Sequence, residues 1–420
     1  MRRLAPILAL TLALTVAPPV HAAAGDLDTT FGGDGIVLGF PTGAIGTAMV
    51  LDSARRTVVV GYSLDVTVDV VAARFLPDGT PDTTFGGDGR VRVDLLNQDL
   101  ALDVAVAPDD GLAIVGRENT NAGSDAFVLR LDPFGAPLTS FGAGTGATTV
   151  SWGRREEVAA AAAFTPGGVL VVGGYVSKST TSNTAFAQLL PDGTLDPTFG
   201  TNGKVLLNLS DGTEQVKDLL VQANGRITAV GYAEKSLVPR FVAIRLLASG
   251  AVDPVFGTGG VVKLDLGPGA DKAVAITRQP DGLYVVVGSA DDGGKAGWAI
   301  VRLRLHGGLD TSFSGDGSLI LPFSAAIDDA RAVVATDTRL IVAGRIHTKG
   351  GLDDLGVVRL RLDGSTDARF GRNGVAKIDV AGRNDWATSV ALTPAGRIVV
   401  GGTGYRLGAY HLAAARLRSG

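Results

Sequence analysis

The sequence contains no cysteine in its 420 residues. Disulfide bonds, zinc–thiolate sites and thiol nucleophiles are therefore excluded. Basic residues are not in excess either, because the net charge is −4 at pH 7. Without a positive field to hold a phosphate backbone, the chain is not expected to bind nucleic acid. After residue 17 no apolar run is long enough to cross a bilayer, so we expect no membrane span in the mature chain.

Recognisable catalytic patterns are also missing. No HExxH, GxSxG or P-loop sequence occurs, and His306, His347 and His411 lie in different parts of the chain. Asp-Gly pairs such as Asp34-Gly35 lack the ligand spacing of an EF-hand, and we interpret them as turns. We therefore predict no catalytic residue, no metal site and no cofactor from motifs.

The N-terminus, in contrast, has the features of an export signal. Met1–Arg3 is positively charged, residues 4–17 are apolar, and small residues around Ala22 and Ala24 offer a cleavage site. The apolar stretch is short for a membrane anchor, which is the alternative. We predict a signal peptide over residues 1–24, cleaved after Ala22 or Ala24, and a secreted or periplasmic protein.

One motif, LDTTFGGDG in its first copy, recurs along the rest of the chain, and its phenylalanine marks each copy. Successive phenylalanines are 54–58 residues apart, which identifies an internal repeat of about 57 residues. The seven are Phe31, Phe85, Phe141, Phe199, Phe256, Phe313 and Phe370. We interpret each one as a wedge buried between neighbouring repeats, since a buried phenylalanine stabilises a fold by about 1.5–3 kcal/mol.

Each copy contains four runs of about six residues that are rich in β-branched side chains and are separated by Gly, Pro and Asp. In the fifth copy these runs cover 261–266, 272–278, 283–289 and 298–305. This composition is typical of antiparallel strands joined by tight turns. Four strands per copy and seven copies predict one all-β domain over residues 25–420, a seven-bladed β-propeller of four-stranded antiparallel blades.

The chain ends indicate that this ring closes. The 50 residues after Phe370 and the seven residues from Gly25 to Phe31 together make one 57-residue period. An open solenoid, the alternative, would need polar caps at its ends. No residues remain for such caps, so we expect the N-terminal strand to complete the last blade.

The motif LDxTFGxxG, followed by a VxVDL strand, an AVAVxPDG hairpin and an aVaRL strand, resembles the delta-60 repeat of exported bacterial proteins. The resemblance covers residues 25–420, although Leu138 replaces the motif aspartate and Ser314 replaces a glycine. It implies a propeller-like fold and an extracytoplasmic setting, and no established activity. The strand order is also similar to that of NHL-type repeats, which implies that the AVAV strand is innermost and that residues 35–40 pair with residues 411–417.

An acidic residue precedes the inner strand in every copy except the first. The six are Asp99, Glu157, Glu214, Asp271, Asp328 and Asp385. They could ring one mouth of the channel and bind a cation or a cationic ligand. Alternatively they are structural, and accept backbone N–H groups or pair with a recurring arginine. These arginines are Arg74, Arg130, Arg245, Arg302, Arg359 and Arg416, with Gln188 in the third copy.

The loops between the third and fourth strands are polar and differ in every copy. The last loop is the most aromatic and supplies candidate binding residues, Tyr405, Arg406, Tyr410 and His411. We therefore expect a monomeric, non-enzymatic binding or scaffold propeller that presents this loop face to an extracellular or envelope protein, a glycan or an ion. The alternative is an extracytoplasmic hydrolase or lyase that uses carboxylates at the channel mouth.

Overall fold

The computed structural model describes residues 23–40, 43–178, 180–291, 293, 296–324, 328–348, 350–380 and 382–420. Residues 1–22, which hold most of the predicted signal peptide, lie outside the described residues. The described residues form strands and one short 3₁₀ helix, η1 (Gly142–Gly144), so the fold is all-β as predicted. None of their helices is long and apolar enough to span a membrane.

Most of the strands belong to four-stranded antiparallel sheets. Three of these sheets come from the start and middle of the chain. In each of them the strands follow one another in sequence order from the innermost to the outermost strand. They are β2 (Ala44–Leu51), β3 (Thr57–Ser63), β4 (Val70–Phe75) and β5 (Arg90–Val93); β14 (Glu214–Val221), β15 (Ile227–Lys235), β16 (Val238–Leu246) and β17 (Val261–Leu264); and β18 (Lys272–Arg278), β19 (Tyr284–Asp291), β20 (Ala296–Leu303) and β21 (Ser318–Leu321).

Two further four-stranded sheets contain the C-terminal part of the chain. They are β22 (Asp329–Ala335), β23 (Arg339–His347), β24 (Asp353–Arg361) and β25 (Val375–Ile378); and β26 (Trp386–Leu392), β27 (Ile398–Arg406), β28 (Ala409–Leu417) and β1 (Ile36–Gly39).

The remaining strands form one eight-stranded sheet. It joins β6 (Gln98–Val106), β7 (Leu112–Thr120), β8 (Gly123–Leu131) and β9 (Ala147–Val150) to β10 (Glu156–Phe164), β11 (Leu170–Ser177), β12 (Ser182–Leu189) and β13 (Lys204–Leu207). The two halves meet through a single parallel bridge between Ser124 and Glu156, whereas the pairs within each half are antiparallel.

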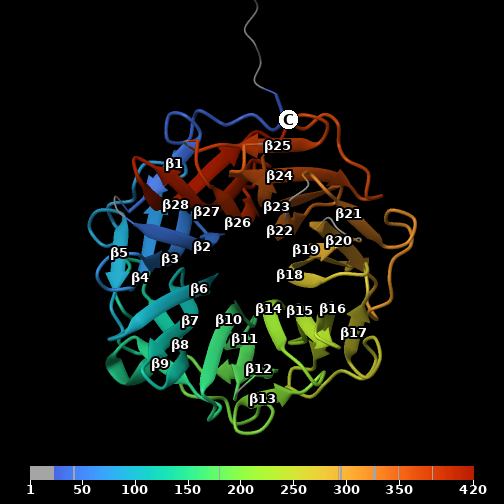
Figure 1. The fold of residues 1–420 in the computed structure, drawn as a ribbon. Coiled ribbons are helices and arrows are strands. Elements are labelled where there is room, and N and C mark those ends of the chain that lie inside the picture. Colours follow the sequence, from blue (N-terminus) through green and yellow to red (C-terminus); the bar gives the residue numbers. More distant parts are fainter. Residues whose placement is uncertain are drawn as a thin grey trace, which may run out of the picture.

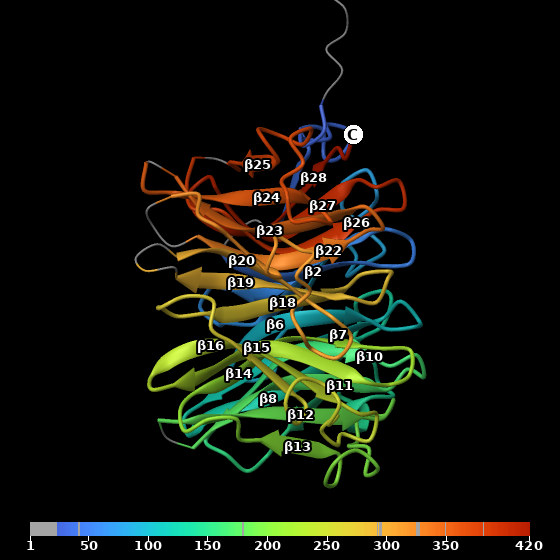
Figure 2. The same ribbon diagram turned by 90° about the vertical axis from the view of Figure 1, so that its right-hand side faces the viewer.

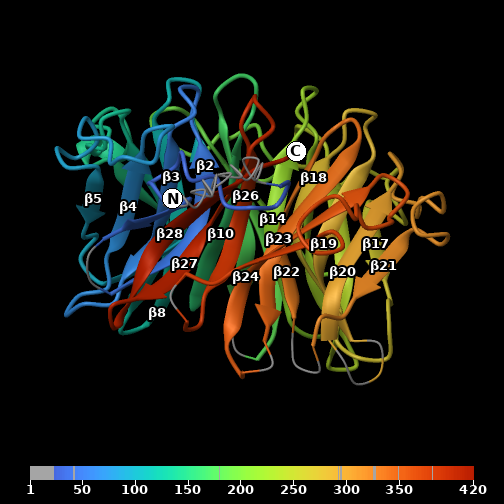
Figure 3. The ribbon, with the colours of Figure 1, turned by 90° about the horizontal axis from the view of Figure 1, so that it is seen from above.

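The sheets are arranged around a central opening, with the first strand of each group innermost and the VxVDL strand outermost (Figure 1). Seen from the sides, the strands run between two faces on which the connecting loops gather (Figures 2 and 3). Second strands such as β3 are buried on both sides, with Val58, Val59 and Val60 at most 1% exposed, because a neighbouring sheet covers each of their faces.

The N-terminal strand completes the last sheet, as the sequence predicts. β1 pairs antiparallel with β28, so that Ile36 lies opposite Ala415 and Gly39 opposite Leu412. A further bridge joins Leu27 to Leu417. The two ends of the chain are therefore held together by backbone hydrogen bonds rather than by a covalent link.

His411 fastens the end of this closing strand. Its Nδ1 lies 2.7 Å from the carbonyl oxygen of Phe40, and its Nε2 lies 2.9 Å from that of Arg406. The side chain is 6% exposed, so the prediction that His411 is a binding residue on the loop face is wrong. Carbonyl oxygens only accept, so both contacts are hydrogen bonds only when both ring nitrogens carry a proton.

The repeated phenylalanines are buried wedges, as expected, and all seven are at most 1% exposed. Phe85, for example, packs in one core cluster with residues of the β2–β5 and β6–β9 sheets. The glycine that follows permits this turn: Gly32 has φ +64°, and a Cβ there would lie 2.6 Å from the carbonyl oxygen of Ile36. In the third copy one additional residue in the motif produces η1.

The repeated arginines form a buried clasp with the motif aspartates. Arg74 Nε donates to Asp82 Oδ2 at 2.8 Å, and its guanidinium carbon lies 4.6 Å from the centre of the Phe85 ring. Its Nη1 donates to the carbonyl oxygen of Pro133, in the turn of the next sheet, at 2.5 Å. The same aspartate–arginine pairs are Asp253–Arg245, Asp310–Arg302, Asp367–Arg359 and Asp28–Arg416.

This clasp corrects the expectation that the arginines pair with the acidic position before the inner strand. Where Leu138 replaces the motif aspartate, Arg130 has no such partner, and its Nη2 lies 3.7 Å from Asp109 instead. Burial alone would raise the pKa of Asp82, but hydrogen bonds from Thr84 and the Arg74 guanidinium lower it below its usual value.

We predict that Arg302→Gln destabilises the protein by about 3–5 kcal/mol, because the buried carboxylate of Asp310 then keeps only the exposed guanidinium of Arg304, 3.6 Å away, as its counter-charge. Arg130→Gln is the matched control and should cost clearly less, since Arg130 has no buried aspartate. Urea unfolding of both variants measures the difference. Equal decreases in the free energy of unfolding would show that the ion pair with the motif aspartate is not the cause of the destabilisation.

Replacement of His411 by leucine should lower stability by about 1–3 kcal/mol, because the partly buried carbonyl oxygens of Phe40 and Arg406 lose their contacts with the imidazole. Hydrogen exchange should also become faster at the amides of β1, since His411 holds its end. His306→Leu, at an exposed position, is the control. A His411→Leu protein with unchanged melting temperature and exchange rates would contradict this role in closure.

Candidate functional site

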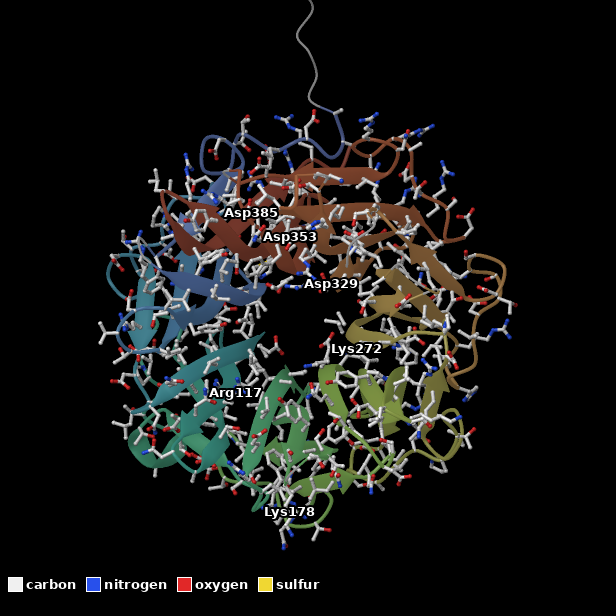
Figure 4. All side chains as sticks on the ribbon, viewed as in Figure 1. Arg117, Lys178, Lys272, Asp329, Asp353 and Asp385 are labelled. Atoms are coloured by element: carbon white, nitrogen blue, oxygen red, sulfur yellow. The ribbon has the colours of Figure 1, made fainter. Side chains whose placement is uncertain are left out.

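The six acidic residues predicted as a ring do not come together in the structure. All six side chains are completely buried, and none lines the central channel. Figure 4 shows Asp385 set back from the central opening, whereas Asp329 lies at its edge. Their carboxylates cap the loop before each inner strand: Glu157 accepts from the backbone N–H groups of Trp152 and Arg154 at 2.8 and 2.7 Å.

The same capping recurs at the other acidic positions. Asp385 accepts from the N–H groups of Val380 and Tyr405 at 2.8 and 2.6 Å. Burial raises the pKa of Asp385 to about 6 and that of Asp99 to about 7, with further contributions from neighbouring carboxylates. The structural interpretation by backbone capping therefore describes these residues better than a shared ligand ring.

The predicted binding residues of the last loop are divided between surface and interior. Arg406 is exposed, and Tyr405 and Tyr410 are partly exposed with their ring centres 5.0 Å apart. Tyr410 also lies 5.7 Å from the ring of Trp386 on the inner strand β26. Trp386, Tyr405 and Tyr410 therefore form an aromatic cluster at the start of the inner strand β26, while His411 is buried.

The channel itself is formed by the innermost strands, and each of them contains a β-bulge. The bulged residues are Thr47, Leu102, Ala160, Lys217, Val274, Arg331 and Thr388. A bulge places two successive residues on one side of a strand. In six of the seven strands both residues line a channel cavity of ≈ 370 Å³, so the pair Lys217-Asp218 brings opposite charges to the same wall.

Three cations gather at the channel mouth on the side of β7, β14 and β18. They are Lys217, Lys272 and Arg117, and Figure 4 shows Lys272 at the edge of the opening. None of the three has an ion pair or a side-chain hydrogen bond within the described part of the chain. Burial, together with the charges of Lys272 and Arg117, lowers the pKa of Lys217 to about 8.

Tyrosines accompany these cations. Lys217 Nζ lies 5.9 Å from the ring centre of Tyr175 and 6.0 Å from that of Tyr232, and Lys272 Nζ lies 5.0 Å from Tyr232. Burial raises the pKa of Tyr62 and Tyr175, and the nearby Arg117 guanidinium acts in the opposite direction. Three cations and three tyrosines therefore share one mouth, which we call the cationic mouth: Arg117, Lys217, Lys272, Tyr62, Tyr175 and Tyr232.

The opposite side of the mouth carries cations that are already paired. Asp329 accepts from Arg331 Nε at 2.9 Å and from Arg345 Nε at 3.0 Å. Arg345 also lies 3.5 Å from Asp353, whose other oxygen is 2.8 Å from His347 Nδ1. Because carboxylates neutralise this side, the positive charge that is free to act on a ligand lies on the side of the cationic mouth.

Two carboxyl groups line the channel beyond the cations. Asp218 Oδ2 accepts from the N–H of Ile276, and Asp103 Oδ2 from that of Ala162, at 2.7 and 2.8 Å, in each case on the next inner strand. Burial raises the pKa of Asp103 to about 6. Burial and the charge of Asp103 raise the pKa of Asp218 to about 7. Neither has an arginine or lysine partner among the described residues.

Sequence reasoning missed these channel residues, although a signal was present. At the position of Asp103 and Asp218 the other copies carry Ala48, Ala161, Ala275, Ala332 and Ser389. Two carboxylates among small side chains break the symmetry of the repeat. Comparing copies position by position along the inner strand would have found them.

We predict that Asp218→Asn makes the protein more stable at pH 8, by about 1–3 kcal/mol, and changes little at pH 4. Because the pKa of Asp218 is raised in the folded protein, the protein is most stable with respect to this group below pH 3.8, the usual pKa of an aspartate. This stability decreases as the pH rises to about 7, where the buried carboxyl group ionises. Melting curves between pH 4 and 8 measure this. The exposed Asp211→Asn is the control, and parallel curves for Asp218→Asn and the wild type would contradict the assignment.

Comparisons with known proteins agree with this architecture. The family model described as "Domain of unknown function (DUF5122) beta-propeller" matches residues 55–85, 166–199, 222–256, 279–313 and 336–370. None of the curated proteins is significantly similar in sequence. The chain is thus a β-propeller repeat protein.

One solved structure with a TM-score above 0.5 shows a similar fold at low sequence identity, and a second structure is a weaker match. A catalytically inactive virginiamycin B lyase from Staphylococcus aureus with quinupristin has a TM-score of 0.51 and 10% identity, covering 91% of this chain and 98% of that chain. The periplasmic gluconolactonase of Pseudomonas aeruginosa has a TM-score of 0.44 and 14% identity, covering 86% and 96%. At these identities the likeness concerns the fold alone.

Proposed function

We propose that this chain is a secreted, seven-bladed propeller that binds an anionic ligand, of the class of acidic glycans, at its cationic mouth. The seven blades follow if the two halves of the eight-stranded sheet, joined by one bridge, are counted separately. Export is supported by the charged and apolar N-terminal sequence. The binding function extends the expectation of a non-enzymatic binding or scaffold protein, and moves its site from the loop face to the channel.

The observation that carries this proposal is the set of unpaired cations. Surface lysines and arginines are common, but Lys217, Lys272 and Arg117 are partly buried beside one another without a carboxylate partner among the described residues. Their mutual repulsion is unfavourable unless a negative charge joins them. Ligand sites place a few convergent polar groups on a rigid scaffold. The rings of Tyr175 and Tyr232 offer flat faces and hydroxyl groups next to the lysine charges.

We expect Lys217→Met to weaken binding of an oligogalacturonate at least tenfold, measured by isothermal titration calorimetry. Lys178→Met removes the same charge at an exposed position far from the opening (Figure 4) and should bind normally. Affinity should also decrease with added salt, since charge dominates the contact. Equal affinity for a neutral cello-oligosaccharide, or for both variants, would refute an anion site at this mouth.

A second candidate is an extracytoplasmic hydrolase or lyase in which Asp103 and Asp218 act as acid and base. The raised pKa values of these two carboxyl groups favour it, because catalytic acids and bases work best near neutral pH. Products released from the bound oligosaccharide by the wild type, and lost in Asp218→Asn, would favour the enzyme. Unchanged ligand recovered from the complex would favour binding alone.

A further inference from the structure

Outside the channel, three aspartates converge where the sheet of β2–β5 meets that of β6–β9. One carboxylate oxygen each from Asp69, Asp94 and Asp99 lies within 4.8 Å of the others. Asp69 and Asp99 are 3% and 0% exposed, while Asp94 reaches the cluster from the surface. Two buried carboxylates at this distance repel each other unless a proton or a cation lies between them.

The buried pair presents free oxygen atoms. Asp69 Oδ2 accepts from Arg92 Nε at 2.5 Å, and Asp99 Oδ2 accepts from the N–H of Leu95 at 2.6 Å. These contacts fix the orientation of both side chains. Asp69 Oδ1 and Asp99 Oδ1 are fully buried and have no hydrogen-bond partner in the described structure. An unsatisfied buried oxygen is costly, and two from different strands at one place call for a shared positive ligand.

The equivalent site in another copy of the repeat shows which kind of group lies between the two acidic residues. In the copy that contains β18, Asp265 and Asp271 occupy the positions of Asp94 and Asp99. There Arg240 extends its Nη2 to 3.4 Å from Asp265 and its Nη1 to 3.5 Å from Asp271. Asp69 occupies the position of Arg240 in the repeat. The N–H of Asp99 donates to the carbonyl oxygen of Val68, which precedes Asp69, and the N–H of Asp271 donates to that of Pro239, which precedes Arg240. An acid has therefore replaced the cation that bridges the other two acids.

Neighbouring side chains do not restore the charge balance. Among the residues that the structure describes, Arg92 is the one cation in contact, and it is shared between Asp69 and Asp65, whose Oδ2 lies 3.0 Å from Arg92 Nη1. The carboxylate of Glu118 adds a further negative charge close to Asp99. The cluster therefore remains strongly negative, in contrast to the balanced site at Arg240.

We propose that Asp69, Asp94 and Asp99 bind a calcium ion, which takes the place that the Arg240 guanidinium has in the equivalent site. Oxygen ligands and a strongly negative site suit a hard divalent cation, and calcium accepts the irregular geometry of carboxylates from separate loops. Magnesium demands a near-octahedral shell and keeps most of its water, so it fits this arrangement less well. The ion would join two neighbouring sheets, at a site distinct from the cationic mouth although Asp99 pairs with Glu118, the neighbour of Arg117.

Titration of the EDTA-treated protein with CaCl2, followed by calorimetry and by thermal unfolding, tests this. We expect one site, a melting temperature that increases with CaCl2, and a smaller effect of MgCl2. Asp69→Ser, which removes the carboxylate and keeps a small polar side chain, should abolish both signals. Asp385→Asn changes the equivalent of Asp99 in another copy and should keep calcium binding.

Two more variants make the outcome independent of folding defects. Asp94→Asn changes an exposed side chain and should weaken calcium binding at least tenfold. Asp69→Arg, which copies the Arg240 site, should melt at a higher temperature than the calcium-free wild type and no longer respond to CaCl2. The proposal is overturned if the wild type shows neither heat nor a melting shift at millimolar CaCl2, or if Asp94→Asn and Asp69→Ser both bind calcium as the wild type does.

Discussion

The buried pair of an arginine and a motif aspartate is the contact on which the arrangement of the sheets depends. Each arginine touches three parts of the structure at once: the aspartate of its own copy, the phenylalanine wedge, and a backbone carbonyl of the next sheet. A charged pair in the interior is stable only with good geometry and satisfied donors. The clasp therefore does more than bury apolar area, because it fixes how one sheet is oriented against the next.

This commitment of residues to packing determines where function can reside. The phenylalanine in every copy, and the arginine and the acidic cap in most copies, are used to hold neighbouring sheets or loops in place. The innermost strands are different, because their bulges turn two residues toward the channel without disturbing the contacts between sheets. Side chains there can vary from copy to copy, and the charged ones are gathered on a few strands rather than spread evenly.

Positions that packing between sheets leaves free to vary explain how copies of one repeat form sites of different charge. At the position of Asp69 and Arg240, two other copies carry Asp125 and Asn183. The backbone pairing at this place is preserved, so an acid, a base or an amide can stand there at little cost to the fold. Electrostatic differences between otherwise equivalent positions are thus the most informative feature of a symmetric protein.

Much of the architecture could be predicted from the sequence. The period of the motif, the four runs per copy and the sum of the two terminal segments predicted all-β sheets, buried phenylalanines and the pairing of β1 with β28, and the structure agrees. These properties are local or follow from counting residues, so they do not depend on knowing which side chains meet.

The site could be predicted only in part, because contacts between copies decide it. From sequence the acidic residues and the arginines were equally regular, and nothing showed that Arg74 reaches Asp82 rather than an acidic cap. His411 was placed on the surface, although it lies beneath the last loop. The sequence determined the repeat and its closure by periodicity. Only the tertiary structure determined which side chains face the channel, because bulges and packing between sheets set the direction of each side chain.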